Sequence, residues 1–262
     1  MIPDDVVRLL TLADSNTRVV VLGTTLLGAA SGLVGSFLLL RKRALLSDTL
    51  SHATLPGVVL AYMISLNFGG DGRSLPLLLA GGAASAILGT LLVLAIRGTS
   101  RLKDDAAQGI VLSVFFAVGL SLLAMAARMP QGNPAGLMGF IYGKAASMLW
   151  FDAVLIGGVA IFAGLVCLAL FKELRLLCFD SGFASVQGWP TVFLDCLLMG
   201  LIVAVTVVGL QSVGLILVVA MLVIPAAAAR FWTHRLSNLL AVAAALGGAS
   251  GFAGTLLSAL LP

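Results

Sequence analysis

The chain has 262 residues, of which 60% are hydrophobic and only 10% are charged, and its formal net charge is +4. This composition excludes a soluble globular domain, in which about a quarter of the residues are charged. The charges gather between apolar runs that are each close to the ~20 residues a helix needs to cross a bilayer. Basic loops beside a membrane account for the small positive charge, so we expect membrane lipid as a partner and no nucleic acid.

Eight apolar runs predict an all-α membrane protein with about eight transmembrane helices. We expect the spans at residues 18–40, 44–66, 75–96, 106–127, 148–171, 191–210, 213–231 and 237–260. They leave little chain for a soluble domain, so residues 1–262 are predicted to form a single transmembrane domain. Residues 1–17 lack the basic start and apolar core of a signal peptide, and we expect an amphipathic segment on the outer surface.

The basic residues predict the orientation of the spans. Ten of the fifteen lysines and arginines fall in one alternate set of connections, and the positive-inside rule makes this set cytoplasmic. Both ends of the eight-span chain are then expected outside. The ten residues are Arg41, Lys42, Arg43, Arg97, Arg101, Lys103, Lys172, Arg175, Arg230 and Arg235.

Small residues and cysteines give structural expectations only. Glycines and serines recur at spacing four, which lets two helix backbones approach closely in a membrane. The three cysteines show no paired spacing, so neither a disulfide framework nor a thiolate metal site is predicted. The small-residue rows are Gly28/Gly32, Gly81/Ser85/Gly89 and Gly247/Gly251, and the cysteines are Cys167, Cys178 and Cys196.

The segment SDTLSHATLPG, residues 47–57, places polar groups inside an apolar span. Asp48 and His52 are four residues apart, so a helix presents both on one face. Pro56 has no N–H to donate to the carbonyl of His52, which becomes a third free ligand atom at a helix kink. Carboxylate, imidazole and carbonyl groups are ligands of first-row divalent metals. Ionisable residues are costly inside a membrane, and a paired acid makes an ion path more plausible than a lone core histidine.

Two further segments break the pattern of regular spans. Pro225 frees the carbonyl of Met221 in the seventh span, where a packing kink is favoured over a direct role for that carbonyl. Residues 130–144, PQGNPAGLMGFIYGK, are too rich in Gly and Pro for a regular span and predict an outer loop or a re-entrant piece. This segment does not match the phosphate-binding loop pattern, so the chain is not expected to hydrolyse ATP by itself.

The cytoplasmic loop 172–190 predicts a short helix. Asp180 is suited to cap its start, Gly188 and Pro190 to end it, and Phe183 and Val186 to form an apolar face at spacing three. Such a helix can dock into a groove on a partner. From these residues alone a simple surface linker is the preferred interpretation.

Three motifs of the chain resemble elements of one family. RKRALLSDTLSHATLPGVVLAY resembles the second-helix signature of the bacterial manganese, zinc and iron ABC transporter permeases, the ABC-3 family. VGLILVVAMLVIPAAAARFWTHR resembles a second element of these permeases, with Ala228 where threonine is common. FDSGFASVQGW resembles their ATPase-coupling segment. Together with the length and the number of spans, the resemblance covers nearly the whole chain.

The resemblance implies a type II ABC importer-like permease in the bacterial cytoplasmic (inner) membrane. It implies two permease subunits, this chain with a second copy or a paralogue, above two copies of a cytosolic ATP-binding subunit. A periplasmic or lipoprotein metal-binding protein would deliver Mn2+, Zn2+ or Fe2+ as cargo, and no cofactor would be permanently bound. Carried over by position, Asp48 and His52 match the metal-coordinating gate, and Ala184 and Gly188 match the coupling helix.

Two other functions remain open at this point. A proton-coupled secondary carrier also needs acids inside its spans, but Asp152 and Asp195 lie near span ends. An intramembrane hydrolase would pair Ser47 or Ser51 with His52, without a recognisable nucleophile loop. The ligand types do not select among the three metals.

Overall fold

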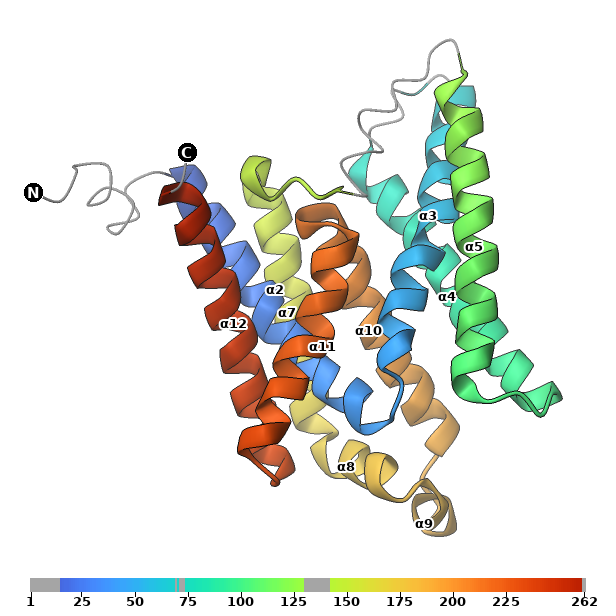
Figure 1. Ribbon diagram of the computed structural model, residues 1–262, viewed down its shortest axis with the longest axis vertical. Coiled ribbons are helices and arrows are strands. Elements are labelled where there is room, and N and C mark those ends of the chain that lie inside the picture. The colour runs from blue at the N-terminus through green and yellow to red at the C-terminus, as the bar shows by residue number, and fades with distance from the viewer. Residues whose placement is uncertain (1–14, 69, 71–73, 130–141, 261–262) are drawn as a thin grey trace, which may run out of the picture. The chain divides into compact units, whose positions relative to one another are not determined.

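The computed structural model describes residues 15–68, 70, 74–129 and 142–260, and every regular element in this part is a helix. Figure 1 shows these helices in chain order. They are α2 (Ser15–Leu40), α3 (Ala44–Asn67), α4 (Leu75–Thr99), α5 (Asp104–Ala127), η1 (Ala145–Ser147), α7 (Trp150–Ala169), α8 (Phe171–Phe179), α9 (Ser181–Val186), α10 (Thr191–Val213), α11 (Leu215–Trp232) and α12 (Leu236–Leu260).

The predicted spans are confirmed. In the described part, eight helices are long and apolar enough to cross a membrane, namely α2, α3, α4, α5, α7, α10, α11 and α12. No span end differs from its expected position by more than three residues, as at Ser15 against the expected 18. Of the predicted surface segment 1–17, residues 1–14 lie outside the described residues and the rest belong to α2. The predicted loop 130–144 also lies mostly outside them.

Contacts divide the chain into two compact units. Unit 1 comprises Met1–Arg41, Lys144–Leu198 and Ala220–Pro262, and unit 2 comprises Lys42–Gly143 and Met199–Val219. Helices α10 and α11 each contribute to both units. The single transmembrane domain expected from the sequence stays a prediction.

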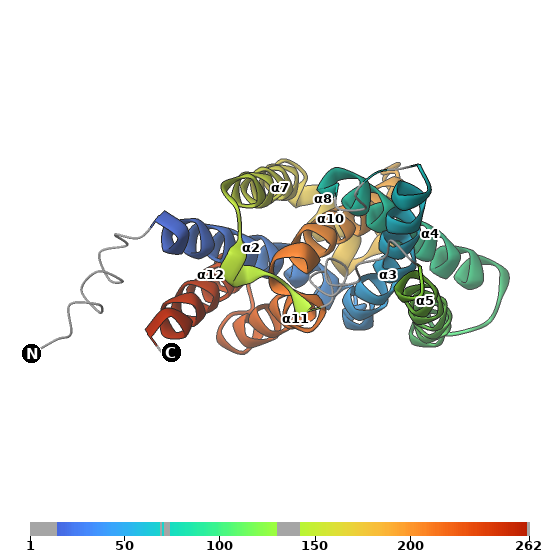
Figure 2. The same ribbon diagram turned by 90° about the horizontal axis from the view of Figure 1, so that it is seen from above.

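Helix α2 is the centre of unit 1 and lies between α12 and α7 (Figure 2). A Cβ atom on Gly28 would collide with the backbone of Gly247, and one on Gly32 with the backbone of Ala243. Both neighbours are backbone atoms of α12, which cannot rotate away as a side chain would. The small-residue rows predicted in these two helices are therefore packing rows.

One polar contact joins the same two helices. The Thr24 hydroxyl lies 2.8 Å from that of Thr255, and it also donates to the carbonyl of Val20 within α2. Inside an apolar bundle a hydroxyl must find such partners, because no water can replace them. The pair holds the register of α2 along α12.

Helix α3 is the centre of unit 2 and packs against both α4 and α5. A Cβ on Gly57 would collide with the carbonyl of Gly81, and one on Gly89 would press on Ala53. The row Gly81/Ser85/Gly89 of α4 therefore fits against α3 as the spacing predicts. On the other side, Gly119 of α5 admits the side chain of Leu55.

A three-residue turn connects α2 to α3, and the boundary between the two units falls within it. Its middle residue, Lys42, has a φ of 55°, a left-handed conformation that is uncommon for a residue other than glycine. Arg41 and Arg43 flank it. Their side chains make different contacts, described below.

Candidate functional site

Asp48 and His52 lie together on α3, as the spacing predicts. The Nε2 atom of His52 is 3.4 Å from Oδ1 of Asp48. The histidine side chain is 18% exposed and the aspartate side chain 38%. At 1.5 Å of rise per residue, His52 stands about 12 Å from the start of the helix, inside the apolar span.

The separation of these two atoms suits a shared cation. It is long for an N–H···O hydrogen bond, which is usually 2.7–3.2 Å. Two ligands at about 2.0–2.1 Å from a tetrahedral ion stand about 3.4 Å apart. The pair can therefore receive a metal ion with little rearrangement.

The His52 ring is oriented by packing. It meets the ring of Phe116 in α5 edge to face, with 4.6 Å between the centroids. Its Nδ1 atom is buried and has no hydrogen-bond partner among the described residues. Phe116 therefore orients the imidazole that faces Asp48. The residues around Phe116 in the sequence do not predict this contact.

The serines beside the pair do not act with it. Ser47 donates to the carbonyl of Ala44, and Ser51 donates to those of Ser47 and Asp48. Both hydroxyls therefore donate their hydrogen bonds to carbonyls of α3, and neither bonds to His52. This geometry does not support the nucleophile that an intramembrane hydrolase needs.

One chain offers an incomplete metal site. The described residues contain no group of three or more histidine, cysteine, aspartate or glutamate side chains that could hold a metal ion. The nearest basic residue in sequence, Arg43, is engaged elsewhere, 3.6 Å from Asp104. Asp104 also pairs with Arg97 at 2.6 Å, so at the start of α5 it meets two cations, one from the turn before α3 and one from α4. Asp48 is left for its histidine neighbour.

Both predicted proline positions lie inside helices. Pro56 is buried within α3 and Pro225 lies within α11, and each helix continues through its proline. A proline cannot donate to the carbonyl four residues earlier, so those of His52 and Met221 lose their usual helical partner. The roles of both prolines as functional kinks stay predictions.

The short helix predicted within residues 172–190 is present as α9. Asp180 is its N-cap, and its Oδ1 atom accepts a hydrogen bond of 2.8 Å from the backbone N–H of Phe183. Gly188 has a φ of 83° just beyond the helix end, a conformation that favours glycine. The sequence analysis missed a second helix, α8, which begins directly after α7 at Phe171.

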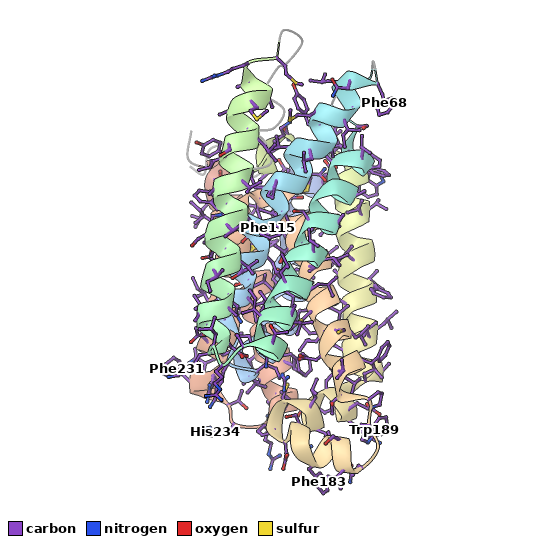
Figure 3. The ribbon with its side chains drawn as sticks, turned by 90° about the vertical axis from the view of Figure 1, so that its right-hand side faces the viewer. Phe68, Phe115, Phe183, Trp189, Phe231 and His234 are labelled. Carbon is purple, nitrogen blue, oxygen red and sulfur yellow. The ribbon has the colours of Figure 1, made fainter. Side chains whose placement is uncertain are left out.

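Helix α9 exposes the apolar face predicted for it. Phe183 is 51% exposed and Val186 85%, whereas Ala184 is buried. Figure 3 shows Phe183 projecting from one end of unit 1, with Trp189 on the same segment. An exposed aromatic and aliphatic pair on a capped helix outside the apolar spans offers a docking surface.

These features define a multi-pass membrane transport protein, with a candidate cation pair inside one span and a short amphipathic helix between two others. The chain belongs to the ABC 3 transport family, whose model matches residues 13–262. The family predicted from three short motifs is confirmed.

Two curated relatives and one solved structure are similar over most of the chain. The manganese transport system membrane protein MntC of Bacillus subtilis is 47% identical over 95% of this chain, which spans 56% of that protein's length. The zinc transport system membrane protein TroC of Treponema pallidum is 44% identical over 95% of this chain and 82% of its own. The structure of PsaBC from Streptococcus pneumoniae in complex with Fab matches with a TM-score of 0.79 and 28% identity, over 99% of this chain and 93% of the other.

Proposed function

We propose that this chain is the membrane-spanning permease subunit of an ABC importer for divalent transition metal ions in the bacterial cytoplasmic membrane. Family membership and the similarity to PsaBC support the permease class. The proton-coupled carrier receives no support from these relatives. One relative of similar identity carries manganese in its name and another zinc, so overall similarity does not select among Mn2+, Zn2+ and Fe2+ as cargo.

The observation that carries the proposal is the Asp48 and His52 pair, 3.4 Å apart inside an apolar span. One carboxylate and one neutral imidazole give a single negative charge. Two copies around a dimer axis would give four ligands and two negative charges, which balance a divalent cation where water is scarce. Closing these ligands around the ion strips its water and blocks the path, and separating them releases it. A paralogous permease with the same pair would serve equally well.

The energy must come from another chain. We assign ATP hydrolysis to two cytosolic ATP-binding subunits and delivery of the ion to a periplasmic or lipoprotein metal-binding protein. The helix α9 (Ser181–Val186), capped by Asp180 and followed by Gly188, supports the first assignment. Its exposed Phe183 and Val186 form the anchor face, and buried Ala184 packs the helix onto the permease.

One experiment tests both sites by two measurements, namely metal uptake into proteoliposomes and co-purification of the ATPase. His52→Ala and Asp48→Ala should lower Mn2+, Zn2+ and Fe2+ uptake at least about 100-fold, because lost coordination removes several kcal/mol. Both variants should keep the ATPase. Phe183→Asp combined with Val186→Asp should lose the ATPase and uptake together, since carboxylates enter a desolvated surface.

Matched variants control for general damage. His234→Ala changes the chain's other histidine, which is exposed, and Ser185→Asp adds a carboxylate to the opposite face of α9. Both should behave as wild type. Wild-type uptake by His52→Ala would contradict the metal pair, and retained ATPase in the Phe183 and Val186 variant would reduce α9 to a linker.

A further inference from the structure

Arg41, the first residue after α2, holds both flanks of the coupling helix at once. Its Nη1 atom donates to the carbonyl of Leu177 at 2.9 Å, and its Nη2 atom lies 2.8 Å from Oδ1 of Asp195. Leu177 belongs to the last turn of α8, and Asp195 lies near the start of α10. Helix α9 lies between these two points in the chain.

The chemistry of these two contacts favours a rigid connection between the end of α2, the end of α8 and the start of α10. Carbonyls in the last turn of a helix lack intrahelical partners, so the Leu177 carbonyl is free to accept from a cation. Asp195 lies in the second turn of α10, where its carboxylate pairs with the guanidinium of Arg41. The side chains of Arg41 and Asp195 are only 17% and 14% exposed, so water screens their attraction less than it does at the surface. A planar guanidinium can hold two acceptors in fixed directions, which a lysine cannot.

The position of Arg41 in the chain connects its contacts with α8 and α10 to the start of α3. After Arg41 come the left-handed Lys42, buried Arg43 and then α3, which carries Asp48 seven positions after Arg41. A displacement of α8, α9 and the start of α10 would therefore act on Arg41 at the end of α2, and a tight turn joins Arg41 to the first residue of the helix with the metal pair. The first segment of unit 1 ends at Arg41.

We propose that Arg41 is the positioning residue that couples α9 to the metal gate, with Asp195 as its partner. The proposal rests on the proposed function and names a route for the energy. It requires that loss of the link leave the ATPase bound and hydrolysing ATP while transport fails. A merely structural ion pair would not change the ratio of metal moved to ATP hydrolysed.

The test measures this ratio for the permease and its ATPase in proteoliposomes, with Mn2+ and Zn2+ as probes. Arg41→Ala and Asp195→Ala should each lower the metal moved per ATP by about tenfold, a typical coupling effect. The double variant should be no worse than either single one, because the two side chains act through each other. Arg41→Lys keeps the charge but not the fork, and should fall between wild type and Arg41→Ala.

Arg101→Ala is the matched control, since it removes the same side chain from an exposed position between α4 and α5. It should keep the wild-type ratio. A wild-type ratio in both Arg41→Ala and Arg41→Lys would overturn the proposal, as would additive losses in the double variant or loss of the ATPase from Arg41→Lys. Failure of the wild-type complex to take up any metal would instead contradict the proposed function.

Discussion

Helices α2 and α3 follow each other in the chain, and each is the centre of its unit, yet they use burial differently. The same share, 67%, of the most apolar window is buried in both. In α2 the buried face holds Gly28 and Gly32 against the α12 backbone. Both helices also bury hydroxyls, such as those of Ser31 in α2 and Ser51 in α3, but of the two only α3 carries an acid and a histidine, Asp48 and His52, inside its span.

The difference separates stability from function within one fold. Small residues bring backbones into contact and stabilise a bundle without polar groups. Ionisable groups are costly inside a membrane, and they indicate where an ion passes. Substitutions in α2 should therefore change how much permease folds, whereas those in α3 should change what the folded permease does.

The largest effect is expected from adding side-chain atoms to the two glycines of α2 that contact α12. Gly28→Ala combined with Gly32→Ala places two methyl groups against the α12 backbone, and overpacking costs about 1–3 kcal/mol at each site. Thermal unfolding of the purified chain in detergent should show the loss. In α7, Gly164 has no atom within 4 Å of an added Cβ, so Gly164→Ala should be neutral or slightly stabilising. Equal melting temperatures for the two changes would refute the packing role of α2.

A smaller effect, on transport only, is expected from Pro56→Ala. The new N–H restores the helical bond to the His52 carbonyl and shifts the imidazole relative to Asp48. We expect uptake to fall about tenfold with normal yield of folded protein. The same change at Pro225 in α11 serves for comparison and should have less effect on uptake. Unchanged kinetics for Pro56→Ala would mean that its carbonyl plays no part.

The smallest effect is expected from Ser51→Ala. The hydroxyl bonds only to carbonyls of its own helix, so its removal should cost about 1 kcal/mol or less and leave uptake within about twofold. Uptake and melting temperature are both measured. Complete loss of function would revive the serine and histidine chemistry of the hydrolase alternative.

Local features of the molecule were predictable from the sequence. Apolar runs of membrane length located the eight spans, and spacing four identified the packing rows of glycine. Asp180 was recognised as a cap because capping depends on residues only three positions apart. The position of Asp48 beside His52 likewise follows from one helical turn.

Contacts between distant segments were not predictable. Arg41 was recognised only as a basic residue of an inner loop, because its partners Leu177 and Asp195 are 136 and 154 residues away. Phe116 is one of several aromatic residues in apolar spans, and nothing in its sequence neighbours indicates that it packs on His52. Helix α8 was missed because its mixed polarity resembles that of a loop.

The contact of α2 with α12 also bears on how the protein is made. Thr24 and Thr255, whose hydroxyls meet, are 231 residues apart. At about 5–20 residues per second, a ribosome needs about 10 to 50 s between them. The glycine face of α2 therefore cannot pack against α12 until that helix has been synthesised. The helices α3, α4 and α5 follow one another in the chain, so they can pack together earlier. We therefore expect the contact of α2 with α12 to form late in the biogenesis of this permease.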